Sequence, residues 1–279
     1  MEILELDSSN VTDYEDLLDK DVAESIGREY YRGIVALDDG GSPSGAMVWE
    51  YKNLDEDDDT KAEICFLHSE ETETAQSLLE EFDDQASSND VCRSFFELSD
   101  LPDEIKQVLR ENGFDISSGE GKNLTISVSD LNALASMKKK LPDGVVALEE
   151  VMEVKFIQGV TNIMFHGKKG IMEDLEFVEK SWYDESISSC VITDGKISGM
   201  FLVHRFPSGM LMPVLFAAMG PNLKMDLMNM ILFTAKKTVE TYPGDTPVCI
   251  KRHSDEVAGL TRKLIGDKQG RLAVLGSKE

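Results

Sequence analysis

The sequence repeats one order of strands and helices at a nearly constant offset, and this repeat limits the folds that the chain can adopt. A hairpin glycine recurs 154 positions later, as Gly45 and Gly199, and a strand valine recurs 157 positions later, as Val91 and Val248. Self-similarity at a fixed offset indicates repeated structural units. A chain of 279 residues is also long enough for two ordinary domains. We therefore predict tandem domains at 1–130 and 131–279.

Alternation, turn dipeptides and helical periodicity give the expected order of elements in each copy. A strand and a helical segment precede three strands of an antiparallel meander, which a helix, a strand, a helix and a closing strand follow. This order predicts an α+β fold in which each unit is a mixed, mostly antiparallel sheet flanked by helices. Residues 131–188 mix helices and loops, and their route stays open. The expected strands are 1–6, 31–37, 46–51, 62–68, 91–98 and 123–129, then 188–193, 200–205, 210–219, 247–251 and 271–275, with helices at 10–30, 70–82, 101–114, 222–242 and 254–266.

The excess acidity of the chain is confined to its first half. Residues 1–130 hold 9 Lys and Arg against 35 Asp and Glu, whereas 131–279 hold 19 against 18. A negative field repels nucleic acid and anionic membranes and attracts cations. We therefore expect a cationic small molecule or a basic protein surface as the partner, and neither nucleic acid nor a membrane. An acidic face that only keeps the protein soluble is the alternative.

The chain lacks the sequence signals of export and of a membrane span. Its first residues, MEILELDSS, are acidic and alternating, unlike a signal peptide. No apolar run approaches the roughly 20 residues of a membrane helix. The cysteines form no C-x-x-C pair, so we expect reduced core thiols in a cytoplasmic protein without a metal site. The oligomeric state stays open. The four cysteines are Cys65, Cys92, Cys190 and Cys249.

Three local features of the sequence resemble the GNAT N-acetyltransferase superfamily. They are the hairpins ending in PSGAMVW and ISGMFLV, the apolar strands that enter helices at 62–82 and 210–242, and the helix-to-strand ending LRENGF. The resemblance covers most of the chain as two units, and another α+β domain with the same element order is the alternative. It implies a transferase that moves an acyl group from acyl-CoA to an amine.

The resemblance also implies a pyrophosphate-binding loop, Q/R-x-x-G-x-G/A, where the fourth strand enters its helix. Glycines let the backbone approach the phosphates, and the helix N-terminus supplies positive potential. Residues 70–75 read EETETA, so only Ala75 agrees with the pattern. We expect no CoA in the first unit, with the glutamates occupying the helix N-terminus as an anion would.

The equivalent stretch of the second unit, AAMGPNLKMDLMNMI at 217–231, also lacks the glycine spacing. A turn at Gly220 and Pro221 precedes a helix that Asn222 can cap, and Lys224 can reach a phosphate. Binding of acetyl-CoA or another acyl-CoA here and a plain capped helix junction are both open. The candidate cofactor-binding residues are Gly220, Asn222, Leu223, Lys224, Lys251 and Arg252, with Lys168 and Lys169 as further cations.

Acid and base residues are poorly represented at the positions that the resemblance implies. A tyrosine on the last helix and a glutamate on the fourth strand commonly move the protons in this superfamily. Leu109 and Thr261 stand at the tyrosine position, and neither can serve as that acid. The candidate catalytic residues are Glu63, which lies in the unit without a CoA loop, and His204, for which a structural role is the alternative.

Two functions are compatible with the sequence. The first is an acyl-CoA-dependent N-acyltransferase that acts on a cationic small molecule or a basic peptide. The second is a catalytically inactive tandem module whose acidic half docks a basic partner. Seven of the 13 methionines fall within 31 residues of the second unit, where they form either an adaptable core or a slot for an acyl chain. They are Met200, Met210, Met212, Met219, Met225, Met228 and Met230.

Overall fold

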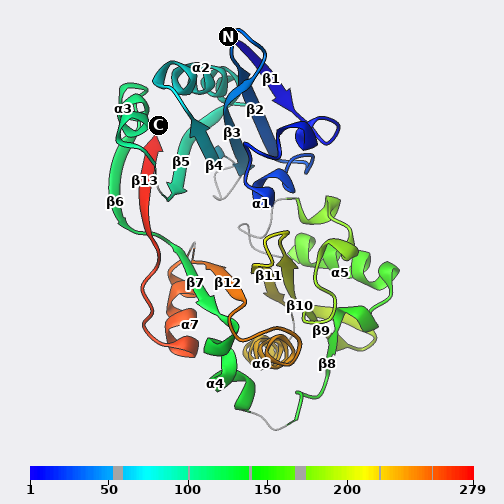
Figure 1. Cartoon of the computed structure of the whole chain (residues 1–279). Helices are drawn as coiled ribbons and strands as arrows, with labels where there is room; N and C mark the ends of the chain where they lie inside the picture. The colour runs from blue at the N-terminus through cyan, green and yellow to red at the C-terminus, as the bar shows by residue number, and fades with distance from the viewer. Residues whose placement is uncertain (53–58, 100, 138–139, 167–173, 220, 253) are drawn as a thin grey trace. The chain divides into compact units, whose positions relative to one another are not determined.

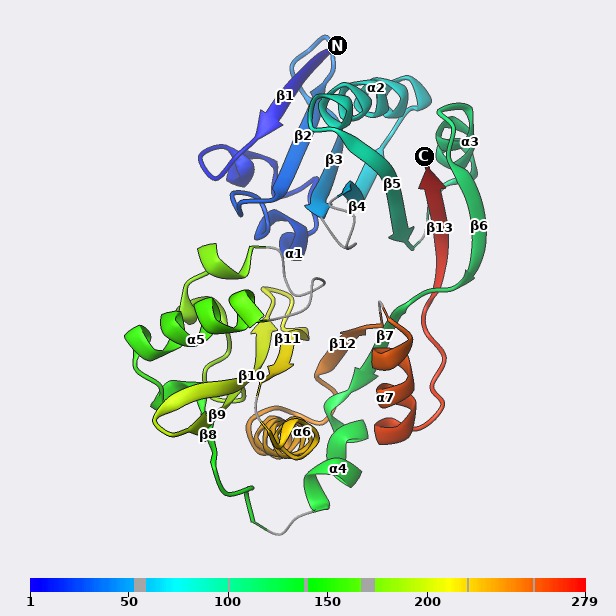
Figure 2. The same cartoon turned by 180° about the vertical axis from the view of Figure 1, so that it is seen from behind.

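The computed structural model of the chain describes residues 1–52, 59–99, 101–137, 140–166, 174–219, 221–252 and 254–279. These residues form two compact units, each with its own sheet (Figures 1 and 2). Unit 1 comprises Met1–Gly121 and Arg271–Glu279, and unit 2 comprises Lys122–Gly270. The predicted α+β fold with two mixed sheets is confirmed.

Unit 1 is built on a seven-stranded sheet in the order β1-β2-β3-β4-β5-β13-β6. β4 and β5 run parallel, and every other pair is antiparallel. Helices α2 and α3 pack on one face, where Trp49 of β3 meets Phe82 of α2. The short helices η1 and α1 cover the opposite face around Val35 and Val48. The elements are β1 (Glu2–Leu6), η1 (Val11–Tyr14), α1 (Lys20–Ala23), β2 (Tyr31–Leu37), β3 (Pro43–Lys52), β4 (Thr60–Ser69), α2 (Thr72–Ser88), β5 (Val91–Leu98), α3 (Asp103–Glu111), β6 (Asp115–Glu120) and β13 (Leu272–Lys278).

Unit 2 is built on a six-stranded sheet in the order β7-β12-β11-β10-β9-β8. Only β11 and β12 run parallel. Helix α5 packs on one face around Phe156 and Leu202, and the long helix α6 packs on the other around Met230 and Phe233. The elements are β7 (Asn123–Ser127), η2 (Val128–Leu131), α4 (Asn132–Ser136), β8 (Val145–Ala147), η3 (Leu148–Glu150), α5 (Glu153–His166), η4 (Leu175–Phe177), η5 (Lys180–Trp182), β9 (Ser189–Thr193), β10 (Lys196–Arg205), β11 (Leu211–Ala218), α6 (Leu223–Thr241), β12 (Pro247–Lys251) and α7 (Asp255–Ile265).

The chain crosses between the two sheets twice, before β7 and before β13. After α3 and β6 the chain crosses into unit 2 as β7, which pairs with β12. After α7 it crosses back as β13, which inserts between β5 and β6 (Figure 1). At the crossing, the N–H of Gly121 donates to the carbonyl of Arg271 at 2.9 Å. Each sheet is therefore completed by a strand from the other half of the sequence.

The predicted domain limits, 1–130 and 131–279, differ from the observed division because of this exchange. The boundary falls between Gly121 and Lys122, and residues 271–279 join unit 1. Periodicity identified β7 and β13 as strands, but periodicity does not specify the sheet that a strand joins. The polar strand β6 was not predicted, since DISSGE lacks apolar alternation.

The hairpin glycines that define the repeat have the same role in both units. Each lies on the middle strand of the meander, beneath the helix that follows the meander. A Cβ on Gly45 would lie 2.8 Å from Cγ2 of Thr74 on α2, and a Cβ on Gly199 would lie 3.1 Å from Cε of Met230 on α6. Glycine therefore allows the close packing of helix on strand that both units share.

The helix predicted at 10–30 is wrong, because the segment contains two short helices instead. Asp19 lies between them in an extended conformation, with ψ of 132°, and its side chain caps α1 by accepting from the N–H of Asp21. Gly27, four residues after the end of α1, has φ of +96°, a conformation that a continuous helix over 10–30 could not contain. The helix predicted at 222–242 is confirmed as α6. None of the helices that the structure describes is long and apolar enough to cross a membrane.

No disulfide joins the four cysteines, all of which lie in the described part of the chain, and they differ in environment. Cys190 is fully buried, and burial raises the pKa of its thiol to about 12. Cys92 is exposed, so the predicted core position is wrong for this residue. It lies on β5, where side chains alternate between the two faces of the sheet.

Candidate functional site

The parallel strands of unit 2 separate almost from their start. Among the residues that the structure describes, Leu211 with Val248 is their single ladder pair, although β11 continues to Ala218. β11 lies inside the sheet, yet six of its eight residues are only half-buried. In unit 1 the equivalent strands stay paired over five positions, from Thr60 to Ile64. Unit 2 therefore has the longer stretch of central strand that lacks a parallel neighbour.

A bulge interrupts the same strand in both units. On β4, Ile64 and Phe66 pair with consecutive residues of β3, which leaves Cys65 as the extra residue. On β11, Pro213 and Leu215 pair with consecutive residues of β10, which leaves Val214 as the extra residue. Bulges turn backbone groups out of the ladder and are frequent beside active sites.

The N-terminus of α6 follows β11 and is exposed. Asn222 is its N-cap residue but forms no capping hydrogen bond through its side chain, contrary to expectation. The predicted contact residues Leu223 and Lys224 are both exposed beside it. First-turn N–H groups of a helix lack partners within the helix and favour an anion. Gly220, predicted for the same turn, lies outside the described residues.

Of the secondary cations, Arg252 is already engaged by the backbone. Its N–H and its Nε both donate to the carbonyl of Lys122 at 3.1 Å, and Nη1 donates to the carbonyl of Lys268 at 3.5 Å. Arg252 thus anchors the start of β7. Lys251 pairs with Asn123 in the ladder. Contacts of Lys251 and Arg252 with a cofactor stay predictions, and Lys168 and Lys169 lie outside the described residues.

His204 is packed as a structural residue. Its ring stacks on Trp182 with centroids 3.6 Å apart and planes 5° apart, and Phe206 meets it edge-on at 4.6 Å. Nδ1 lies 2.7 Å from the carbonyl oxygen of Trp182. The side chain is buried. These contacts favour the structural alternative, and the catalytic role of His204 stays a prediction.

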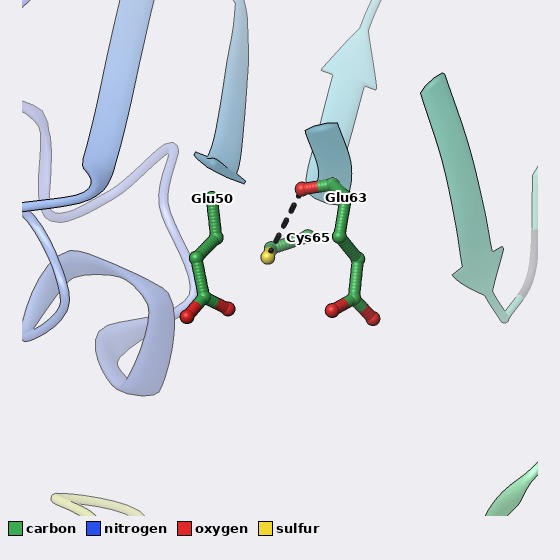
Figure 3. A group of neighbouring side chains, drawn as sticks. All are labelled: Glu50, Glu63 and Cys65. Carbon is green, nitrogen blue, oxygen red and sulfur yellow. Dashed lines mark hydrogen bonds between the residues drawn. The ribbon is translucent and has the colours of Figure 1, made fainter. Parts of the chain in front are cut away.

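Glu63 lies in a buried ionic cluster of unit 1 rather than in an open site. It forms an ion pair with Lys52, which also contacts Glu50 Oε2 at 3.1 Å. Glu50 and Glu63 come from neighbouring strands, and Cys65 follows Glu63 on β4 (Figure 3). Cys65 donates through Sγ to the carbonyl of Glu63 at 3.4 Å. The carboxylate of Glu63 is already ion-paired to Lys52. Its role as a general base stays a prediction.

The sequence reasoning missed Glu50, Lys52 and Tyr31 as parts of this cluster. Glu50 and Lys52 stand two residues apart in the otherwise apolar strand AMVWEYK, so they share a face of the sheet. Charged residues are almost never fully buried unless paired. Two charged residues on one face of an otherwise apolar strand therefore indicated that a buried ionic partner, such as Glu63, lies on a neighbouring strand.

The N-terminus of α2 carries Glu70, Glu71 and Glu73, all exposed. Glu71 is the N-cap residue, and its side chain forms no capping hydrogen bond. Glu73 lies in the first turn of α2, as expected, where the helix dipole favours a carboxylate without a capping hydrogen bond. The three carboxylates surround the place where a phosphate would have to approach, and like charges repel it.

The residues that stand at the tyrosine position, Leu109 and Thr261, are both buried. Leu109 of α3 is fully buried in the core of unit 1. Thr261 of α7 is buried and donates to the carbonyl of Val257 at 2.7 Å. Neither side chain offers an acid for a leaving thiolate.

Comparison with known proteins identifies the fold. No protein-family model and no curated protein matches the chain. Among solved structures it is similar to a tandem GNAT protein from the clavulanic acid biosynthesis pathway, with a TM-score of 0.62 and 11% identity over 100% of this chain and 98% of that one. It is also similar to L-PGS from Bacillus licheniformis, with a TM-score of 0.56 and 10% identity over 97% and 91% of the two chains.

Identities this low show the fold alone. The chain has a tandem GNAT fold, as the resemblance of its sequence implied.

Proposed function

We propose that the protein is an acyl-CoA-dependent N-acyltransferase whose donor site lies in unit 2. The observation that carries this proposal is the early separation of β11 from β12, next to an exposed helix N-terminus. The backbone of β11 beyond Leu211 offers N–H and C=O groups to the amides of an acyl-CoA. The first turn of α6 and Lys224 offer positive potential to its phosphates. Because the glycine spacing is missing, we expect weaker binding of the pyrophosphate than a complete loop gives.

The transfer joins the amine nitrogen to the acyl carbon, breaks the carbon–sulfur bond, and leaves CoA as a thiol. Acyl-CoA supplies the activated thioester. The chain contributes chiefly by holding donor and amine together and by donating backbone N–H groups to the oxyanion. The bulge at Val214 places such groups outside the ladder. Because neither Thr261 nor His204 offers a ready acid or base, we expect a slow enzyme with water as proton acceptor.

The amine substrate is proposed to be cationic, as a small molecule or a basic peptide. Unit 1 holds 10 Lys and Arg against 35 Asp and Glu, whereas unit 2 holds 18 of each. The whole net charge of −25 therefore belongs to unit 1. A field of this sign raises the local concentration of cations near the protein.

Lys224→Glu is expected to weaken CoA binding at least tenfold, because it replaces a cation by an anion near the phosphates. Losing one favourable charge contact and gaining one unfavourable contact, each of order 1 kcal/mol, accounts for a loss of this size. Isothermal titration with CoA and acetyl-CoA measures it. Lys263→Glu is the matched control, because it makes the same charge change away from the proposed site. β11 and β12 are parallel, so α6 and α7 begin at the same edge of the sheet, and Lys263 lies at the other end of α7. Equal affinities in the two variants would contradict the donor site, and no binding at millimolar ligand would remove the enzyme proposal.

A second candidate function is an inactive module whose unit 1 docks a basic partner. The exposed glutamates at the start of α2 and the charge of unit 1 favour it. Such a complex is expected to dissociate at about 0.5 M salt, where the Debye length falls to a few ångströms. A partner that stays bound to the immobilised protein at that salt concentration would speak against electrostatic docking.

A further inference from the structure

The ionic cluster of unit 1 places two carboxylates directly opposite each other. Glu50 of β3 and Glu63 of β4 are ladder partners, and Lys52 follows Glu50 on the same face. All three side chains are at most 10% exposed. Like charges directly opposite on antiparallel strands are destabilising. The two carboxylates therefore require a cation between them.

The ammonium group of Lys52 is that cation. Nζ lies 3.1 Å from Glu50 Oε2 and forms a second ion pair with Glu63 Oε2. Burial by itself lowers the pKa of a lysine, yet the carboxylates of Glu63 and Glu50 hold the pKa of Lys52 above its ordinary value. Two of the three donors of a primary ammonium group thus meet buried carboxylates.

Further polar and charged groups complete the cluster. Ligand atoms of Glu50, Glu63 and Cys65 lie within 4.8 Å of one another (Figure 3). The hydroxyl of Tyr31 donates to Glu50, and burial together with Glu50 raises the pKa of Tyr31. Arg28 lies 4.8 Å from the centroid of the Tyr31 ring. The two carboxylates thus have Lys52 between them and a second cation, Arg28, beside Tyr31.

Stability does not account for these charges. The same face of the sheet is otherwise filled by buried apolar residues such as Val35, Ala46 and Val48. Replacing a buried ionic group by well-packed apolar residues is often neutral or stabilising. Clusters of buried ionisable groups with perturbed pKa values occur preferentially at sites of recognition or catalysis.

We propose that Glu50 and Glu63 form a binding site for a primary ammonium group, which Lys52 occupies from within the same chain. The fitting ligand is an unbranched aliphatic primary amine, since it replaces the alkyl stem of Lys52. Lys52 is the last residue of β3 and pairs with Lys61 at the end of the ladder, so withdrawing its side chain disturbs little of the sheet. A tethered group competes at an effective concentration of order millimolar. Unit 1 is thus an amine site closed by its own chain, independently of acyl transfer in unit 2.

Chemical rescue of Lys52→Ala tests this proposal without any CoA. We expect n-propylammonium chloride, at tenfold excess over its Kd, to raise the Tm of this variant by about 4 °C and to leave the wild type unchanged. Tetramethylammonium, which has no N–H donor, is expected to have no effect. Lys106→Ala is the matched control, because Lys106 pairs at 2.8 Å with Asp103, whose carboxylate is exposed. Equal responses of the two variants, or equal effects of the two salts, would overturn the proposal.

A second variant keeps the test decisive if Lys52→Ala does not fold. The double variant Lys52→Ala with Glu63→Gln removes the repulsion between the carboxylates, and saturable binding of propylammonium to it is expected by titration calorimetry. Absence of saturable binding would refute the ammonium site. Zn²⁺ is a further probe, since oxygen and sulfur ligands also suit this metal. Stabilisation of the wild type by Zn²⁺, without rescue of Lys52→Ala by the amine, would make the cluster a metal site and overturn the proposal.

Discussion

Replacing Gly276 by alanine is expected to destabilise unit 1 by about 3 kcal/mol, the upper end of the usual cost of overpacking a core. A Cβ at this position of β13 would overlap two ring atoms of Phe96, Cε1 and Cζ. Phe96 is buried and packs on Phe114 with ring centroids 5.5 Å apart, so the ring has little room to move. Because β13 pairs with both β5 and β6, the strain falls inside the sheet.

Gly119→Ala provides the matched control on the neighbouring strand. Gly119 pairs with Ala273, and a Cβ there would meet nothing within 4 Å, so we expect a change within about 0.5 kcal/mol. The protein has two tryptophans, Trp49 in unit 1 and Trp182 in unit 2. In a Trp182→Phe background, fluorescence during denaturant unfolding reports unit 1 alone. Equal midpoints for the two glycine variants would contradict the insertion of β13 into this sheet.

Local patterns were sufficient to predict most elements of the fold. The bounds expected for 31–37, 91–98 and 247–251 coincide with β2, β5 and β12, because apolar alternation is a property of each segment alone. The repeat predicted two similar units for the same reason. The exchange of β7 and β13 could not be predicted, since the pattern of a strand specifies neither the sheet that it joins nor its place in that sheet.

The candidate site was predicted less well, because its contacts join segments that are separate in sequence. Glu63 was selected from its place on the fourth strand, but its carboxylate is ion-paired to Lys52, eleven residues earlier on another strand. Arg252 was selected as a cation, whereas the carbonyls of Lys122 and Lys268 bind its guanidinium. Charge and spacing alone cannot distinguish a free cation from one already bound by backbone carbonyls.

The two units differ in ways that suggest separate roles. In unit 1 the parallel strands stay paired longer, glutamates surround the start of α2, and a lysine fills the carboxylate pair. In unit 2 the strands separate early and the first turn of α6 is exposed. After β6 of unit 1 the chain continues into unit 2 as β7, which pairs with β12 beside the proposed donor site.

Replacing Met230 by aspartate is expected to destabilise unit 2 by about 4 kcal/mol or more, because it places an unpaired charge in the core. Met230 is fully buried, packs in one cluster with Phe233 and Phe216, and has Cε close to Gly199. These contacts favour the core reading of the methionines over a slot for an acyl chain. Hydrogen exchange of peptides from β10 and β11 is expected to lose its protection.

Met225→Asp is the matched control on the same helix. Met225 is 61% exposed in the first turn of α6, where an acidic residue favours the helix dipole, so stability should change by no more than about 0.5 kcal/mol. The same carboxylate stands near the proposed phosphate position, so CoA affinity should fall although the fold is intact. If Met230→Asp instead remains folded and loses only acyl-CoA binding, Met230 lines a ligand slot. The packing of α6 on Gly199 would then contribute little to the stability of unit 2.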